Sequence, residues 1–165
     1  GDIYVVDTFN QRVQKFDANG NFILKWGSSG TADGQFLHPH DVAVSRSGYV
    51  YVGDYHIPNV QKFDANGNFI LKWGSNGTAD GEFDYPSGLA VDSHGNIFVS
   101  DEGNKNIQEF GGNGEFITKW GSKGFGDGKF NHNHYIADDS TGNVYEADRT
   151  NGYVQNFDSL SLIHI

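Results

Sequence analysis

The chain has 165 residues, no cysteine and a net charge of −10. The absence of cysteine excludes disulfides and thiolate zinc sites. With only eleven Lys and Arg residues to meet phosphates, the chain is a poor match for RNA or DNA, so we expect no nucleic-acid partner. It also contains no run of about 18 apolar residues, and we expect no membrane segment.

The sequence repeats with a period of 47 residues. The phrase K-W-G-S places tryptophans at 26, 73 and 120 (73 − 26 = 120 − 73 = 47). The structural repeat positions with this spacing are Trp26, Trp73, Trp120, Phe16, Phe63, Phe110, Phe157, Asp7, Asp54, Asp101 and Asp148. We expect the aspartates to accept backbone N–H groups in the turn after each second strand. A period of this length is typical of stacked units such as propeller blades.

Four strand patterns fill each period. The chain starts in a second strand at residues 1–7, and this partial blade runs over 1–28. Complete blades follow at about 40–75 and 87–122. In the second of these, 87–95 is expected to hold the first strand and the turn after it, and the other three strands are expected at 96–101, 107–110 and 115–120. Asn-Gly between the last two strands predicts a tight hairpin, since both residues tolerate positive φ. A partial blade at 135–158 completes a propeller segment over 1–159.

About three and a half blades are present, and a propeller ring closes with four to eight. Because the chain contains no methionine, we expect a piece of a longer polypeptide. Residues 160–165 break the repeat and resemble a translated sequencing-adapter end, so we predict a non-native tail there. A diverged terminal strand is the alternative.

Several phrases resemble the NHL family of β-propellers. They are F-x-H-P-H-D-V-A-V at 36–44, V-Y-V-G-D at 50–54 and Y-P-S-G-L-A-V-D at 85–92. The resemblance covers residues 1 to about 158 and implies an all-β propeller of four-stranded blades, six in a complete ring. Members include binding platforms, sensor ectodomains, RNA-binding regions and one group of lyases. We predict a non-enzymatic binding module whose blade loops take a protein, peptide or glycan ligand, with no cofactor.

A second resemblance, to the peptidyl-α-hydroxyglycine amidating lyases, gives the first alternative. His40 and His134 lie 94 residues apart, twice the period, at the start of the first strand in alternate blades. The lyases place histidines there, so the resemblance implies zinc at His40 and His134 with a further histidine outside the chain. A-D-R-x-N-G at 147–152 likewise implies that Arg149 lies near the substrate of a metal-dependent C–N lyase. Gly103, however, stands where the lyases have a tyrosine.

Self-association is the second alternative, because an open arc of blades leaves unpaired strand edges. Such an arc predicts a self-assembling structural or filament subunit.

For location we favour the extracellular space or the cell surface, because many relatives are extracellular and Asn76-Gly-Thr78 forms a glycosylation sequon. A cytoplasmic location is the alternative.

Overall fold

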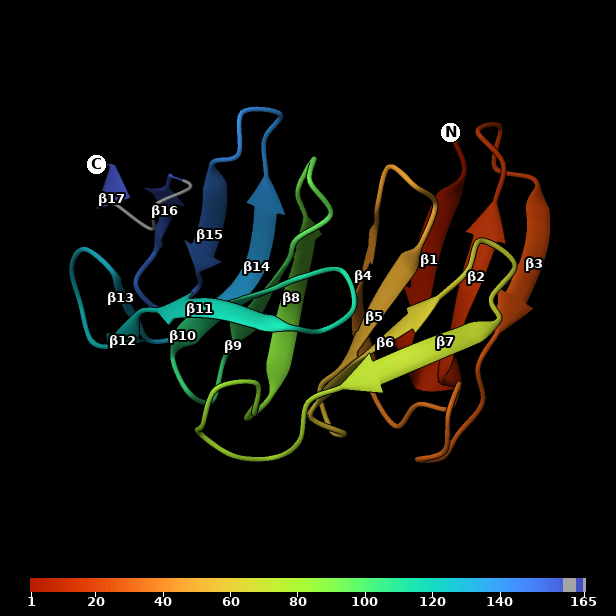
Figure 1. Cartoon of the computed structure of the whole chain (residues 1–165), viewed down its shortest axis with the longest axis horizontal. Coiled ribbons are helices and arrows are strands. Elements are labelled where there is room, and N and C mark those ends of the chain that lie inside the picture. The colour runs from red at the N-terminus through yellow and green to blue at the C-terminus, as the bar shows by residue number, and fades with distance from the viewer. Residues whose placement is uncertain (159–162, 165) are drawn as a thin grey trace.

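Four antiparallel sheets stand side by side in chain order (Figure 1). The computed structural model describes residues 1–158 and the backbone of 163–164. In Figure 1 the sheets follow one another from right to left, and the two termini lie at opposite ends of the row. The arrangement confirms the expected all-β, partial propeller. Within the described residues, no helix is long and apolar enough to cross a bilayer.

The first sheet has three strands and the next three have four each. The first contains β1 (Ile3–Asp7), β2 (Arg12–Phe16) and β3 (Phe22–Trp26), with the short 3-10 helix η1 (Thr8–Asn10) after β1. The second contains β4 (Pro39–Val44), β5 (Val50–Asp54), β6 (Asn59–Phe63) and β7 (Phe69–Trp73). The third contains β8 (Pro86–Val91), β9 (Ile97–Asp101), β10 (Asn106–Phe110) and β11 (Phe116–Trp120). The fourth contains β14 (Asn133–Asp138), β15 (Val144–Asp148), β16 (Tyr153–Phe157) and β17 (Ile163–His164). We number these sheets blades 1 to 4.

A short parallel pair, β12 (Ser122–Lys123) with β13 (Lys129–Phe130), closes the glycine-rich loop between blades 3 and 4. The two earlier loops carry single parallel bridges at the equivalent positions, Ser29 with Phe36 and Asn76 with Phe83. These bridges bring each phenylalanine to the boundary between two blades. The connecting loops are therefore ordered parts of the repeat.

The hairpins between the third and fourth strands are tight, as expected: in blade 1 the Asp17 N–H donates to the Asn21 oxygen at 2.9 Å. Only the glycine of the Asn-Gly pair adopts positive φ, with Gly20 at +83°. Asp17 also organises the turn, because its carboxylate accepts the backbone N–H groups of Asn19 and Asn21 at 2.8 Å each. The ladder then shifts register between Lys15 and Phe16. The hairpin is thus a tight turn capped by a side chain and followed by a bulge.

The last blade extends further than the sequence pattern indicated. We expected its strands to end by residue 158, but β17 pairs with β16 through Phe157 opposite Ile163 and Asn156 opposite His164. Residues 159–162 and 165 lie outside the described part of the chain. The non-native origin of 160–165 stays a prediction.

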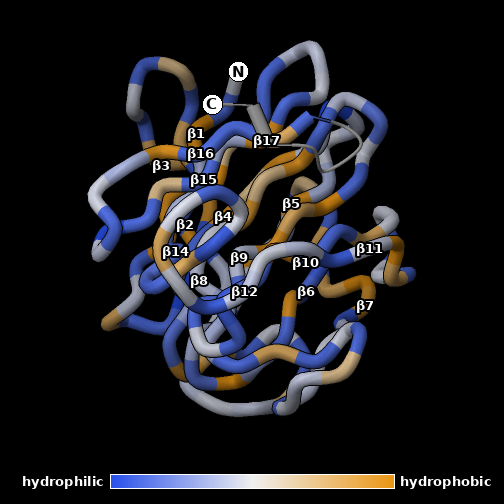
Figure 2. The backbone as a smooth tube through the Cα atoms, turned by 90° about the vertical axis from the view of Figure 1, so that its left-hand side faces the viewer, coloured by the Kyte–Doolittle hydropathy of each residue, from blue (hydrophilic) through white to orange (hydrophobic). Residues whose placement is uncertain are grey.

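The hydrophobic core lies between neighbouring blades. Val13 of blade 1 packs in one cluster with Phe36 and Val50 of the next unit, and similar clusters join blades 2 and 3 and blades 3 and 4. The repeated aromatic residues meet across the same boundaries, with ring centroids 5.8, 5.8 and 5.7 Å apart in the pairs Trp26–Phe63, Trp73–Phe110 and Trp120–Phe157. In Figure 2 the hydrophobic colour follows the strands, and the loops are mostly hydrophilic or neutral. The 47-residue period is therefore a period of contacts between blades.

Candidate functional site

Buried aspartates hold the loops at one end of the blades. Asp54 accepts backbone N–H groups from Leu37 at 2.7 Å, His38 at 3.1 Å, His56 at 3.0 Å and Ile57 at 2.9 Å. The equivalent bonds in the next blades run from Asp84 and Asn104 to Asp101, and from Asn131, His132, Thr150 and Asn151 to Asp148. Each carboxylate thus joins the loop before the first strand to the loop after the second. Both loops therefore present their side chains at the same end of the blade.

Blade 1 departs from this pattern. The carboxylate of Asp7 binds side chains instead, with Arg12 Nε at 2.7 Å, Gln14 Nε2 at 3.1 Å and Asn10 Nδ2 at 2.8 Å. The hydrogen bond from Arg12 is the main cause that lowers the pKa of Asp7. Asp7 is thus the one repeated aspartate that forms an ion pair with arginine in the described residues.

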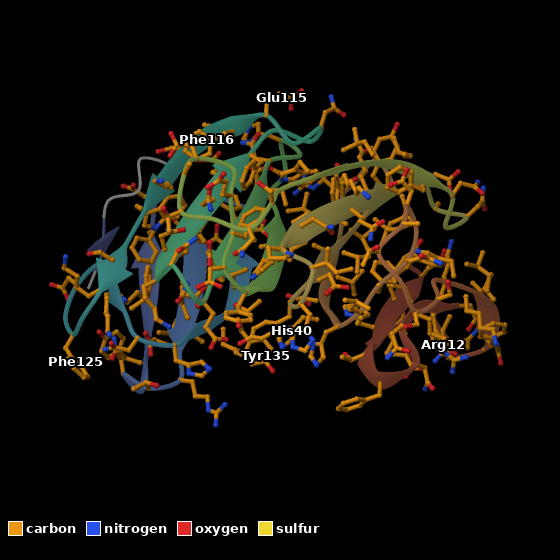
Figure 3. The ribbon with its side chains drawn as sticks, turned by 90° about the horizontal axis from the view of Figure 1, so that it is seen from below. Arg12, His40, Glu115, Phe116, Phe125 and Tyr135 are labelled. Carbon is orange, nitrogen blue, oxygen red and sulfur yellow. The ribbon has the colours of Figure 1, made fainter. Side chains whose placement is uncertain are left out.

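The two histidines of alternate blades come together on the inner strands. The rings of His40 on β4 and His134 on β14 lie edge to face, with centroids 4.8 Å apart. Figure 3 shows His40 close to Tyr135, although their strands belong to blades 2 and 4. The Nδ1 of His40 donates to the backbone oxygen of Ser87 at 2.8 Å, which leaves the lone pair on Nε2. Two histidines meet here without a third at the intervening position, which is Ser87.

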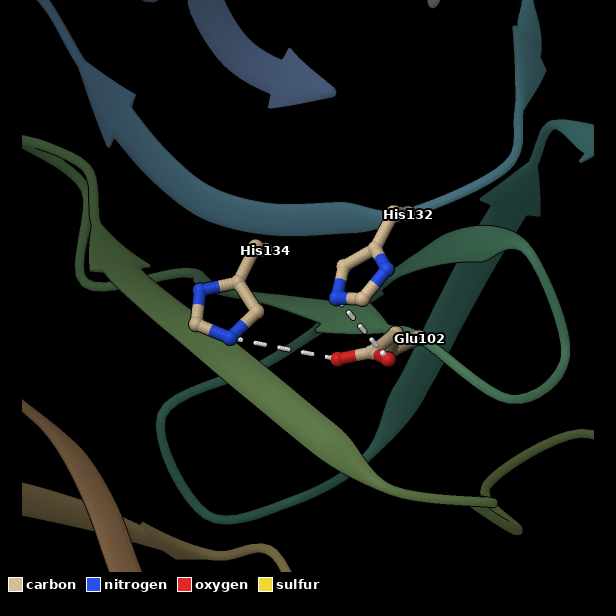
Figure 4. A group of neighbouring side chains, drawn as sticks. All are labelled: Glu102, His132 and His134. Carbon is tan, nitrogen blue, oxygen red and sulfur yellow. Dashed lines mark ion pairs between the residues drawn. The ribbon is translucent and has the colours of Figure 1, made fainter. Parts of the chain in front are cut away.

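A different group of donors gathers around His134. The Oε1 of Glu102, in the loop after β9, lies 3.2 Å from His132 Nε2, and its Oε2 lies 3.9 Å from His134 Nε2 (Figure 4). One ligand atom from each of these three residues lies within 4.8 Å of the other two. His40 lies outside this group. The structure thus brings together three residues from the junction of blades 3 and 4 that have the donor atoms of a metal site.

Burial sets the protonation of this region. Desolvation lowers the pKa of His134, and the neighbouring His40 adds to the effect. Desolvation also lowers the pKa of His38. Tyr55 has its pKa raised to about 12, first by burial and then by the negative charge of Glu102. At neutral pH, His38 and His134 are therefore uncharged rings, and the Tyr55 hydroxyl keeps its proton.

Arg149 and Gly103 bear on the resemblance to the lyases. Arg149 is exposed and lines a groove of about 360 Å³ with Tyr135. Its charge contributes to the lowered pKa of His134, so it lies within electrostatic reach of the histidines. Gly103 packs so tightly that a Cβ there would stand 2.3 Å from the backbone oxygen of Asp84. The position at which the resemblance implies a tyrosine therefore has no room for any side chain.

Aromatic rings form a connected series across the same end of all four blades. Ring centroids lie 6.3 Å apart for Phe9–His38, 5.8 Å for His38–Tyr55 and 4.8 Å for Tyr55–Tyr85. The series continues through Tyr55–His40 at 5.5 Å and His40–His134 at 4.8 Å to His134–Tyr135 at 4.5 Å. Phe9, Tyr85 and Tyr135 are 89%, 45% and 63% exposed. We call the surface made by Phe9, His38, Tyr55, Tyr85 and Tyr135 the aromatic face.

Sequence comparisons agree with this architecture. The NHL repeat profile matches residues 83–110, which cover the first three strands of blade 3. This match identifies an NHL repeat in blade 3. A segment of 46 residues, 28% of the chain, is 48% identical to the protein brain tumor of Drosophila melanogaster and covers 4% of that protein.

Solved structures similar to this chain show the same fold at low sequence identity. A streptogramin B lyase matches with a TM-score of 0.74 and 13% identity, over 99% of this chain and 50% of the lyase. Virginiamycin B lyase from Staphylococcus aureus matches with a TM-score of 0.74 and 10% identity, over 99% of this chain and 51% of the lyase. The WD40 repeats of RRP9 match with a TM-score of 0.74 and 15% identity, over 98% of this chain and 47% of that structure. The chain therefore spans about half the length of these propellers, and the likeness concerns the fold alone.

Glu102 and His132 are the site residues that the sequence interpretation missed. One signal was present. In blades 2 and 3 the residue after the second-strand aspartate faces the residue 30 positions later, at the start of the next blade, in the pairs Tyr55–Tyr85 and Glu102–His132 (85 − 55 = 132 − 102 = 30). A comparison of residues 30 positions apart, in adjacent blades, finds the Glu102–His132 pair.

Proposed function

We propose that the chain is a binding module that takes a protein or peptide segment on its aromatic face. The observation that carries this proposal is the unbroken series of ring contacts over four blades, which ends in exposed Phe9 and Tyr135. Aromatic side chains are enriched in protein interfaces because they give a large contact area at a low cost in conformational entropy. Propellers also bind through the loops at one end of their blades.

The loops beneath this face are held in place before any ligand arrives. Leu37, His38, His56 and Ile57 all donate to Asp54, so the segments on either side of His38 and Tyr55 share one anchor. A preorganised surface loses less conformational entropy on binding than a mobile one. The net charge of −10 further favours a partner that is basic near the contact.

The test is a random peptide library displayed and selected on the purified chain. Enriched peptides should bind at least tenfold more weakly to the variants Tyr85→Ala and Tyr135→Ala, because an aromatic anchor contributes more than about 1.4 kcal/mol. Tyr49→Ala is the matched control: Tyr49 is 40% exposed and precedes β5, which places it at the opposite end of the blade.

Three results count against the proposal. One is that selection enriches no peptide. Another is that Tyr49→Ala weakens binding as much as the variants of the aromatic face do. The third is binding to a glycan array with no enriched peptide, which would replace the ligand class with carbohydrate.

Self-association is a second candidate, favoured by one observation. Val154 on blade 4 is 63% exposed, and Ile3 and Val5 on blade 1 are 47% and 42% exposed, although their equivalents in the inner blades are buried. Two copies that pair these surfaces would cover both. Sedimentation velocity over a range of concentrations should then show assembly by this chain, weakened by Val154→Asp. A monomer at every concentration rules the idea out.

A further inference from the structure

We infer that Glu102, His132 and His134 form a binding site for a divalent transition-metal ion, and that zinc is the ion best matched to their donor atoms. The three side chains converge where the loop after β9 meets the start of blade 4 (Figure 4). This inference does not depend on the ligand proposed for the aromatic face.

The spacing of the donor atoms supports the site. In a tetrahedral zinc site with bonds of about 2.0–2.2 Å, neighbouring donors lie roughly 3.3 Å apart. Glu102 Oε1 and His132 Nε2 already lie at 3.2 Å, and Glu102 Oε2 and His134 Nε2 at 3.9 Å. One donor atom from each of the three residues lies within 4.8 Å of the other two, so one ion could reach all three after a small shift of the side chains. Two imidazoles and one carboxylate leave a fourth position open for water.

Unpaired polar atoms are the second observation. Glu102 Oε2 and His134 Nδ1 are buried, and neither has a hydrogen-bond partner within the described residues. The side chains of Glu102 and His134 are only 12% and 17% exposed. A buried carboxylate oxygen without a donor costs stability, so native proteins provide it with a hydrogen bond or a cation. A metal ion held by Glu102 and both histidines would supply that cation.

The site differs from the pair that the lyase resemblance implies. That pair uses His40 and His134, but His40 does not belong to the converging group, and its Nδ1 is held by the backbone oxygen of Ser87. Glu102 and His132 are specific to blades 3 and 4, because the equivalent residues one period earlier are Tyr55 and Tyr85. Variants of His40 and His132 therefore separate the two sites experimentally.

The experiment titrates Zn²⁺ into the whole purified chain, freed of metal by a chelator, and follows the heat of binding. Co²⁺ serves as the spectroscopic probe, because its visible absorption reports nitrogen and oxygen ligands. We expect one ion per chain. Changes to groups that merely orient a ligand cost 10- to 100-fold in metal affinity, so Glu102→Gln and His132→Asn should each weaken binding by more than about 100-fold.

Two control variants define the result. His94→Asn alters a histidine whose side chain is 80% exposed and lies outside the group, and it should bind as the original chain does. His40→Asn should also retain binding. Circular dichroism and thermal unfolding without metal establish that each variant folds, and His134→Asn replaces any ligand variant that does not. The inference fails if the chain binds no zinc, if His132→Asn binds normally, or if His40→Asn abolishes binding and His132→Asn does not.

Discussion

Equivalent side chains are buried at the inner boundaries between blades and exposed at the two end faces. Val60 on β6 and Ile107 on β10 are 0% exposed, but Val154, at the same position on β16, is 63% exposed. The first pair is covered by the blade that follows, through Phe83 and Phe130. In the described residues no blade follows Val154. Burial in this molecule is thus determined by the neighbouring blade and not by the residue itself.

The other end of the row shows the same difference. Ile3 and Val5 on β1 are 47% and 42% exposed, whereas Val50 and Val52, one period later, are completely buried. Both end faces therefore carry the apolar residues of an inner boundary. Each inner blade packs one face against the blade before it and the other against the blade after it. Matched substitutions at inner and end positions therefore measure what the contact between blades contributes to the free energy of unfolding.

The largest difference is expected for Val60→Ala against Val154→Ala. Removing two methyl groups from a fully buried site loses about 1.6 kcal/mol of transfer free energy and adds a cavity term, about 2–3 kcal/mol in all. At the exposed Val154 the loss should stay within about 0.5 kcal/mol. Urea unfolding of both variants measures the two values. Equal losses would show that the end face is covered in solution.

Glycines in the hairpins give the next comparison. Gly114 has a φ of +87°, and a Cβ there would stand 2.7 Å from the ring of Trp73 in the preceding blade. Gly20 has a similar φ of +83°, but a Cβ there would meet nothing within 4 Å. Alanine strains both backbones by about 1–2 kcal/mol. Only Gly114→Ala also displaces the tryptophan.

Gly114→Ala should therefore lower the free energy of unfolding by about 1–2 kcal/mol more than Gly20→Ala does. Unfolding followed by tryptophan fluorescence measures both the stability and the environment of the ring. If the two variants lose the same amount, the contact between Trp73 and Gly114 contributes nothing beyond the turn itself.

Much of the fold can be predicted from the sequence, because the repeat encodes it four times. Trp73, Phe110 and Asp101 recur at fixed spacing, and strand patterns between them give boundaries within one or two residues, as for 107–110 against β10 (Asn106–Phe110). The tight hairpin was predicted from Asn-Gly, but the role of Asp17, whose carboxylate accepts the N–H groups of the turn, was not.

The candidate site was harder to predict, because it forms between blades. Repeat spacing compares equivalent positions, and it places His40 and His134, whose ring centroids lie 4.8 Å apart, at the same position of alternate blades. Glu102 has no acidic equivalent at Tyr55 or Arg149, so a comparison of equivalent positions does not single it out. Its contact with His132 is found only by comparing residues 30 positions apart in adjacent blades. Contacts of this kind depend on the rotation between adjacent blades, which a single period does not reveal.

Glu146 is a polar exception inside an inner boundary, and it gives a pH-dependent prediction. It is completely buried at the position that Val52 and Val99 occupy in blades 2 and 3, and its Oε2 accepts from Ser100 Oγ at 2.5 Å. Burial holds its pKa well above the ordinary value. Folding therefore favours the protonated carboxyl, and stability falls as the pH rises from the unfolded-state pKa toward the folded-state pKa.

Glu146→Gln keeps the shape of the protonated side chain and removes the titration. We expect it to raise the free energy of unfolding by about 1 kcal/mol at pH 8, because there the carboxyl is ionised in the unfolded chain and must be protonated, or buried as a charge, on folding. At pH 4 the change should be almost nothing. Denaturant unfolding of both proteins at pH 4, 6 and 8 gives the difference at each pH. A difference that does not change with pH would mean that Glu146 does not titrate on unfolding.

The smallest effect concerns the lysine before each tryptophan. Lys72 on β7 pairs with Asp33 of the preceding loop at 2.8 Å, and Lys119 pairs with Asp80 in the same way. Lys25 occupies the equivalent position in blade 1, and it has no ion pair among residues 1–158. The Lys72 and Asp33 side chains are 37% and 60% exposed, so solvent screens the pair.

Lys72→Ala should therefore lower the free energy of unfolding by about 0.2–1 kcal/mol at low salt, and Lys25→Ala should leave it unchanged. Added salt should reduce the difference between the two variants, because the contact is electrostatic and exposed. A double-mutant cycle with Asp33→Asn isolates the pair from the loss of the lysine stem. If Lys72→Ala and Lys25→Ala cost the same at every salt concentration, the ion pair contributes nothing to the contact between the blades.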